Sequence, residues 1–383
     1  MVKNDLEKLR EYFAEVEMIA EVKTKKDLHR FIHFVEKLYK HDIHYVFPLF
    51  GPLGKELDEQ VLKTGKYKAI LSLNFKGEAQ GRMLYTYDFS KHAQKNVCYF
   101  SFFDAIDDQS VADELFEYME SDMRKDGVDF AEGTFAPYDP DTRRGILVKG
   151  FDTDPSLFTS YNYEYYGKLL ENRGYVKVYD TFTIKADVSP ESERRLKALK
   201  DHFHRRFNVR IDSLDYKNLE KDLEDVHRIF QEATNELIYQ DPPSMDMIRN
   251  VAENMRMFLD PDYIKIAREN ETERPVGFCL VLPDYNQVFK ITKGRIRPLK
   301  ILFGKKKITR ARGILQYLVP EYQGTGLIGS IYQSVYAKFR ENHITEFVAG
   351  TMMEKNPNAF HVFDKFGGRL HKIYRIYGKE LTQ

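Results

Sequence analysis

The 383-residue chain has little cysteine, no long apolar run and no excess of charge of either sign. Its two cysteines, Cys98 and Cys279, lie in strand-like apolar runs away from any metal-ligand spacing, so we expect reduced thiols and no metal site. Lys+Arg and Asp+Glu both total 59, which excludes a global field that would draw the whole molecule to nucleic acid. No run of about 18 apolar residues and no signal-peptide core occurs, so we expect no membrane span and a cytoplasmic location.

The remaining composition is that of a chain that can build ordinary hydrophobic cores. Hydrophobic residues make up 42% and charged residues 31%, which is typical of globular domains. A chain of this length is long for one core, so two domains are the expected organisation.

The two halves of the sequence repeat one order of elements: strand, helix, hairpin, strand, helix, strand, helix and strand. Hydrophobic periodicity predicts these elements in the first half at 18–22, 26–39, 67–75 with 81–87, 97–103, 109–125 and 130–134. In the second half it predicts them at 209–214, 219–230, 263–268 with 275–282, 313–319, 326–342 and 346–352. The repeat predicts an α/β (α+β) protein with two copies of one domain, at 1–186 and 209–383. The polar stretch between them, 187–208, is expected to be a linker that becomes a solvated helix.

The strongest local signal is a glycine-rich turn between a predicted strand and a predicted helix, Gln323-Gly324-Thr325-Gly326-Leu327-Ile328-Gly329. Glycines let the backbone approach a ligand closely, and the first amides of a helix have no intrahelical partner, so such a turn favours phosphate. The alternative is a glycine-rich helix start without a ligand, because short glycine patterns are common. Ser330 stands where a Walker loop has lysine, and the upstream hairpin does not have the strand–helix–strand order that is typical of a dinucleotide fold.

A second motif follows about 30 residues later, with Asn356, Ala359, Phe363 and Gly367 at its marked positions. Together the two motifs resemble the GNAT superfamily of acyl-CoA-dependent N-acyltransferases. The resemblance implies two tandem GNAT-like domains, each a mixed and mostly antiparallel sheet flanked by helices. It implies that the turn from Gln323 to Gly329 holds the CoA pyrophosphate, that Leu318 and Val319 pair with the pantetheine arm, and that Asn356 and Phe363 flank the thioester.

From Lys23 onward the chain is also similar to the bacterial YghO-like family. The stretches that carry this likeness are Gly150-Phe151-Asp152-Thr153, the run from Tyr165 to Glu171, and the run from Val319 to Gly324. Two departures from the GNAT pattern bear on catalysis. Ile328 replaces the second small residue of the turn, and Phe363 replaces the tyrosine that protonates the leaving thiolate in many members.

The equivalent turn of the first half has no glycine and carries Asp104, Asp107 and Asp108 where a pyrophosphate would lie. Like charges would repel the phosphates, whereas Asp107 or Asp108 is a suitable helix N-cap. We therefore expect the first half not to bind CoA.

An insertion in the second half, residues 286–312, carries only basic charges, interleaved with apolar residues. It predicts either an electropositive flap for the CoA 3′-phosphate, an anionic substrate or an acidic surface, or an amphipathic helix with a solvated basic face. No aromatic stacking pattern accompanies the charges, so nucleic acid is not expected. Its basic residues are Lys290, Lys293, Arg295, Arg297, Lys300, Lys305, Lys306, Lys307, Arg310 and Arg312.

Two residues are candidates for acid–base chemistry, Glu354 and Tyr322. Glu354 follows a predicted strand near the place where this fold parts its sheet, so its carboxylate could accept the amine proton. The alternative is a surface carboxylate that caps the helix at Asn356.

The resulting hypothesis is an acyltransferase that uses acetyl-CoA or another acyl-CoA, needs no metal, and acylates a small-molecule or peptide amine. A non-catalytic acyl-CoA-binding protein, or a transferase with a bulky acyl or aminoacyl donor, is the alternative. The sequence leaves a homodimer open.

Overall fold

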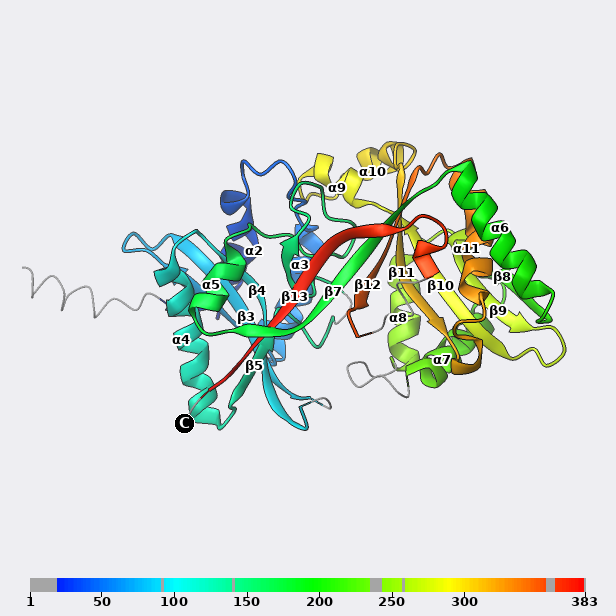
Figure 1. The fold of residues 1–383 in the computed structure, drawn as a ribbon. Helices are drawn as coiled ribbons and strands as arrows, with labels where there is room; N and C mark the ends of the chain where they lie inside the picture. Colours follow the sequence, from blue (N-terminus) through cyan, green and yellow to red (C-terminus); the bar gives the residue numbers. More distant parts are fainter. Residues whose placement is uncertain are drawn as a thin grey trace, which may run out of the picture. The chain divides into compact units, whose positions relative to one another are not determined.

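The computed structural model describes residues 19–90, 93–139, 142–234, 243–256, 259–355 and 362–381. The chain forms two compact α/β units (Figure 1). Unit 1 comprises Met1–Asp180, Thr292–Ile296 and Tyr374–Gln383, and unit 2 comprises Thr181–Ile291 and Arg297–Ile373. The expected α/β (α+β) class and the repeated mixed sheet are confirmed.

The sheet of unit 1 has the strand order β1-β2-β3-β4-β5-β13, and β6 also pairs with β13. Along the order from β1 to β13, neighbouring strands are antiparallel except for β4 and β5, which are parallel. The strands are β1 Ile19–Glu21, β2 Lys68–Leu73, β3 Ala79–Ser90, β4 Lys95–Ala105, β5 Phe130–Gly133, β6 Ile146–Lys149 and β13 Arg369–Glu380.

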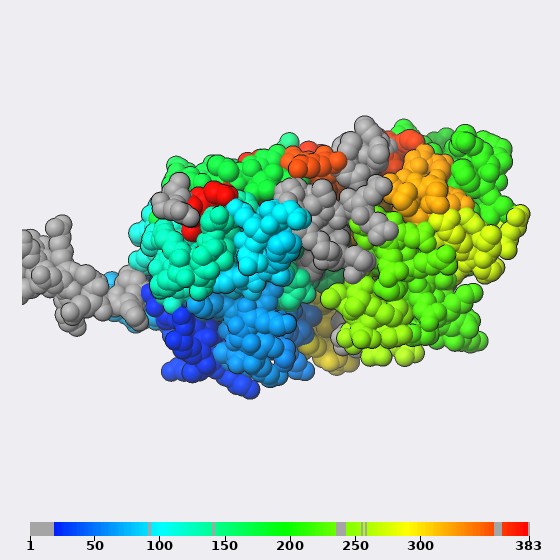
Figure 2. Space-filling view, turned by 90° about the horizontal axis from the view of Figure 1, so that it is seen from below, coloured from blue at the N-terminus to red at the C-terminus, as the bar shows by residue number. Residues whose placement is uncertain are grey.

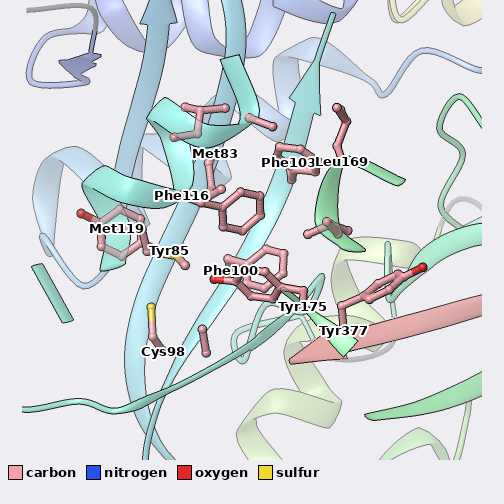
Figure 3. Close-up of a cluster of buried hydrophobic side chains, with 14 of the residues drawn as sticks. Met83, Tyr85, Cys98, Phe100, Phe103, Phe116, Met119, Leu169, Tyr175 and Tyr377 are labelled. Atoms are coloured by element: carbon pink, nitrogen blue, oxygen red, sulfur yellow. The ribbon is translucent and has the colours of Figure 1, made fainter. Parts of the chain in front are cut away.

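Helices cover both faces of this sheet, and the alternation of side chains along the strands explains why. Ile70 of β2 contributes to the core on one face, whereas its neighbours Ala69 and Leu71 contribute to the core on the other. The first core packs under α4 and α5 and includes Phe100 and Tyr377 (Figure 3). The second packs under α2, α3 and η1. The helices are α2 Lys25–Leu38, α3 Phe50–Leu57, the π-helix η1 Asp58–Lys63, α4 Gln109–Asp126 and α5 Tyr166–Asn172.

The sheet of unit 2 follows the same plan, with the order β7-β12-β11-β10-β9-β8. Only the neighbours β11 and β12 are parallel. The strands are β7 Val176–Asp187, β8 Val209–Ser213, β9 Ile264–Glu269, β10 Pro275–Pro283, β11 Arg310–Leu318 and β12 Glu346–Met353.

One face of this sheet packs against α7, with Phe230 and Phe278 in the core, while α11 buries Ile331 and Phe339. Helix α6 packs along α11: its Leu199 and Phe203 lie against the start of α11, and its Glu193 pairs with Arg340 near the end of α11. The stretch expected to be a solvated helix does form this helix, but it is not solvated all round, because its Phe203 is fully buried. The helices are α6 Pro190–His204, α7 Leu219–Thr234, α8 Met245–Met255, η2 Pro261–Tyr263, α9 Asn286–Thr292, α10 Pro298–Lys305, η3 Pro320–Tyr322 and α11 Leu327–Glu341.

Each unit is completed by a strand from the other half of the sequence. The end of β13 pairs with β5 in unit 1, with Tyr377 opposite Gly133. The end of β7 pairs with β12 in unit 2, with Lys185 opposite Val348. In the space-filling view, the red surface near the chain's end lies among the cyan to green surface of unit 1 (Figure 2). The domain bounds expected from the sequence, 1–186 and 209–383, stay a prediction. Strands β7 and β13 each have residues in both compact units, so neither strand belongs wholly to one unit.

No helix in the described part of the chain is long and apolar enough to cross a bilayer.

Candidate functional site

Strands β11 and β12 of unit 2 part halfway along their length. They pair in parallel from Arg310 opposite Glu346 to Gly313 opposite Ala349, where the pairing ends. Beyond this point β11 stays paired with β10 as far as Leu318, and β12 stays paired with β7. The facing edges of the two strands therefore carry backbone groups without a strand partner.

An irregularity in each strand, directly after the last shared pair, explains the parting. In β11, Ile314 is an extra residue relative to β10, because Leu280 is opposite Leu315 while Val281 is opposite Gly313. Such a bulge bends its strand and increases the twist. In β12, the register against β7 shifts between Ala349 and Met352. Gly350, within that shift, has a φ of 107° and lies so close to its neighbours that a Cβ would be 2.6 Å from the carbonyl oxygen of Phe182.

The glycine-rich turn lies at the end of β11, as the sequence predicts. Gly324 and Gly326 adopt positive φ values of 73° and 99°, in the region that favours glycine. Gly326 is the N-cap of α11, and no side chain caps that helix. Among the described residues, the amides of Gly324, Gly326, Ile328 and Gly329 have no hydrogen-bond acceptor. The turn thus presents a set of free N–H donors at a helix N-terminus, where the helix dipole also favours an anion.

Two polar side chains of the turn hold its shape. Gln323 donates through Nε2 to the carbonyl oxygen of Leu318 at 3.2 Å, which ties the turn to the end of β11. Thr325 donates through Oγ1 to the carbonyl oxygen of Tyr322 at 2.7 Å. Leu327 and Ile328 bury their side chains. Only their backbones can therefore contribute to an anion site.

Tyr322 does not lie at the parted strands. Its hydroxyl donates to Oε1 of Glu269 at 3.0 Å, and Glu269 ends β9, two strands away from β11. Its ring packs against Phe207, with ring centroids 5.5 Å apart. Burial, followed by the neighbouring Glu269 carboxylate, raises the pKa of Tyr322 to about 12. Its proton is thus already engaged.

Glu354 lies directly after β12, at the same edge of the sheet as the glycine-rich turn, because parallel strands end at one edge. It is exposed to solvent. The structure therefore brings Glu354 and the turn to the ends of the two parted strands. Asn356, the other predicted residue of this region, lies outside the described residues.

Phe363 is a core residue. It is 1% exposed, and its ring lies against Tyr332 of α11 and Phe366, with centroid distances of 5.7 and 5.3 Å. The hydroxyl of that same Tyr332 donates to Oε1 of Gln316, which lies on the stretch of β11 that no longer pairs with β12. No sequence motif marks Tyr332 or Gln316, so neither residue was predicted.

The start of α11 also serves as a packing surface for α6. A Cβ on Gly329 would lie 2.9 Å from Cδ1 of Leu199, and one on Gly326 would lie 4.0 Å from Cβ of Phe203. Ser330 is fully buried, and its Oγ lies 3.0 Å from Nε2 of His204, within hydrogen-bond distance. The spacing of Gly326, Gly329 and Ser330 at i, i+3 and i+4 is the signal that could have predicted this contact.

Unit 1 has the same parted strands but a closed helix start. Strands β4 and β5 pair only from Cys98 opposite Ala131 to Phe100 opposite Gly133. The carboxylate of Asp108 accepts from the amide of Ser110 at 2.9 Å, so it caps α4 itself. The predicted N-cap is confirmed. In unit 1 a carboxylate of the protein therefore occupies the start of the helix, whereas the corresponding helix start in unit 2 has no side-chain cap.

Buried polar groups surround the equivalent strand end of unit 1. The guanidinium of Arg82 pairs with the Asp104 carboxylate at 2.6 Å, and the hydroxyls of Tyr39 and Tyr166 donate to the same carboxylate at 2.9 and 3.2 Å. All four residues are buried. Asp104 is therefore part of an internal network and is not free to meet a ligand.

Among the described residues, no group of three or more His, Cys, Asp or Glu side chains is arranged so that it could hold a metal ion.

No family model matches the chain. Protein YghO of Escherichia coli strain K12 is 23% identical over 374 residues, which covers 93% of this chain and 94% of YghO. The bacterial ceramide synthase of Caulobacter vibrioides is 24% identical over 381 residues, which covers 94% of this chain and 96% of the synthase.

Two solved structures match over nearly the full length. The GCN5-related N-acetyltransferase from Sphaerobacter thermophilus has a TM-score of 0.55 and 11% identity, covering 96% of both chains. The tandem GNAT protein from the clavulanic acid biosynthesis pathway has a TM-score of 0.55 and 9% identity, covering 95% of this chain and 99% of that chain. The chain therefore has the tandem GNAT fold, as the sequence resemblance implied.

Proposed function

We propose that unit 2 binds acyl-CoA, with acetyl-CoA as the simplest donor, and transfers the acyl group to an amine. One observation carries the proposal: the free amides of Gly324, Gly326, Ile328 and Gly329 follow the end of β11, and the last part of β11 no longer pairs with β12.

Each of these features matches one part of CoA. The free amides and the helix dipole suit the pyrophosphate, which is a compact anion. The unpaired edge of β11 offers backbone donors and acceptors to the amide groups of the pantetheine arm, as a sheet edge does to an added strand. An arm bound in this way would direct the thioester into the space between the parted strands.

The chemistry requires little from the protein beyond placement. The amine nitrogen attacks the thioester carbonyl, the new C–N bond forms, and the C–S bond breaks to release CoA thiolate. A thiol has a pKa of roughly 8.5, so the thiolate can leave without a protein proton donor. This is consistent with the burial of Phe363 among other rings. The amine proton must pass to a base, and Glu354 is the candidate at this edge of the sheet.

A second candidate function has a lipid amine as the acceptor. It is favoured by the similarity to the protein named a bacterial ceramide synthase, since a ceramide is an N-acylated lipid amine. A non-catalytic acyl-CoA-binding protein is the third candidate. Thiol release from acetyl-CoA and long-chain acyl-CoA in the presence of small amines or lipid amines distinguishes the three.

The test of donor binding is calorimetric titration with acetyl-CoA. Gly324→Glu would place charge among the free amides, in open space, so we expect affinity to fall at least about 100-fold, equivalent to about 2.7 kcal/mol. Gly77→Glu is the matched control, because Gly77 also has a φ of 73° and no atom near its Cβ position. The proposal fails if wild type does not bind, or if both variants bind as wild type does.

A further inference from the structure

Helix α10 presents three large apolar side chains to solvent. Leu299, Leu302 and Phe303 are 70%, 63% and 66% exposed, although side chains of this kind are usually buried. Their spacing of i, i+3 and i+4 places them on one face of the helix. The three together form an outward apolar stripe.

The orientation of this stripe is imposed by packing on the opposite face of the helix. A Cβ on Gly304 would lie 2.8 Å from Cγ1 of Val288 in α9, so α10 approaches α9 through this glycine. Ile301, on the same face as Gly304, is partly buried. Because Gly304 permits this close contact, α10 cannot rotate its apolar stripe inward without losing the contact with α9.

Basic residues surround the stripe. Lys300 and Lys305 flank it on either side around the helix, and Arg297, Lys306 and Lys307 stand at the two helix ends. All five are exposed, and none has an ion-pair partner within the described part of the chain. No aspartate or glutamate occurs anywhere between residues 286 and 312. Helix α10 therefore exposes an apolar stripe, and every charged side chain of its own segment is positive.

We propose that α10 docks unit 2 on an anionic lipid bilayer. A short helix with an apolar stripe and a basic border matches the boundary between acyl chains and headgroups, where the apolar side chains are buried and the cations meet lipid phosphates. A CoA phosphate would satisfy the charges but would leave Leu302 and Phe303 in water. A nucleic acid would likewise leave the aliphatic side chains without a partner.

The experiment is co-sedimentation of the full chain with vesicles of phosphatidylcholine containing 30 mol% phosphatidylglycerol, and with pure phosphatidylcholine vesicles. We expect binding to the anionic vesicles that weakens as salt is raised. Leu302→Ser/Phe303→Ser should weaken it at least tenfold, and Lys305→Gln/Lys306→Gln/Lys307→Gln should weaken it and reduce the salt dependence. Phe75→Ser and Lys25→Gln/Lys26→Gln alter exposed residues of unit 1 and should leave binding unchanged.

A fluorescence measurement reports on α10 directly. The chain contains no tryptophan, so Phe303→Trp introduces a single indole whose emission should shift to the blue when anionic vesicles are added. Absence of vesicle binding by wild type, or binding that the α10 variants do not change, would overturn the proposal. A different outcome would be that wild type binds no vesicles but forms a dimer at high protein concentration, and that Leu302→Ser/Phe303→Ser is a monomer. That outcome would assign the stripe to contact with a second copy of the chain.

Vesicle binding is measured without acyl-CoA, so its outcome is independent of the proposed transferase activity.

Discussion

Gly329 of α11 and Leu199 of α6 are in such close contact that any side chain on Gly329 would begin 2.9 Å from Cδ1 of Leu199 and 3.1 Å from its Cβ. The glycine at the end of the proposed pyrophosphate turn thus has a structural role of its own. It lets α6 pack on α11 while its amide remains without an acceptor.

Gly329→Ala should therefore lower the unfolding free energy by about 1–3 kcal/mol, the usual cost of overpacking. Leu199→Ala should be partly compensatory, so that the double variant loses less than the sum of the single variants. Denaturant unfolding of the four proteins measures this coupling. Gly51→Ala, in α3 with no atom near its Cβ position, is the control and should be neutral or stabilising. Additive losses would contradict the contact.

Glu354→Gln should lower kcat of acyl transfer by about 100-fold, because it removes the proposed acceptor of the amine proton. Tyr322→Phe should change kcat less than about threefold, since its hydroxyl is engaged by Glu269. Steady-state release of CoA thiol, measured at saturating donor, compares the two. A larger loss in Tyr322→Phe than in Glu354→Gln would reverse the assignment.

Stability should depend on pH through Glu132 of β5. Burial raises the pKa of this carboxyl to about 7, and Arg144 only partly opposes the shift. Below about pH 4.5 the group is neutral in both states. As pH rises from there through 7, the unfolded chain releases the proton more readily than the folded chain, so the unfolding free energy falls by about 3 kcal/mol.

Glu132→Gln removes this titration. Its Tm should exceed that of wild type at pH 8 and equal it near pH 4. Glu164→Gln, at an exposed position, is the control and should match wild type at both values. An equal Tm for Glu132→Gln and wild type at pH 8 would show that the buried carboxyl carries no such penalty.

Both thiols should be unreactive in the folded protein. Cys98 and Cys279 are fully buried, and burial raises the pKa of both, that of Cys279 to about 12. The reactive thiolate is therefore scarce at pH 8, and access is blocked as well. Titration with a disulfide reagent should detect neither cysteine under native conditions and both in denaturant. Rapid labelling of the native protein would contradict the burial.

Local patterns predicted much of the candidate site. The position of the turn, the start of α11 and the N-cap at Asp108 depend on neighbours within a few residues, which hydrophobic periodicity and capping preferences report well. The role of Tyr322 could not be predicted in this way, because its partner Glu269 lies on a strand far away in the sequence. The burial of Phe363 depends likewise on the ring of Tyr332 from α11, which is distant in the sequence.

By itself, the sequence determined the order of elements in each half. It also determined that α11 of unit 2 begins without a side-chain cap and that Asp108 caps α4 of unit 1. Only the tertiary structure decided that β7 completes unit 2 and that β13 completes unit 1. It alone also showed where β11 parts from β12, and that the stripe of α10 faces solvent. The reason is physical: helix caps and turns arise from contacts between near neighbours. Strand partners and exposed faces depend on which distant surfaces pack together, and a repeated pattern satisfies several such pairings equally well.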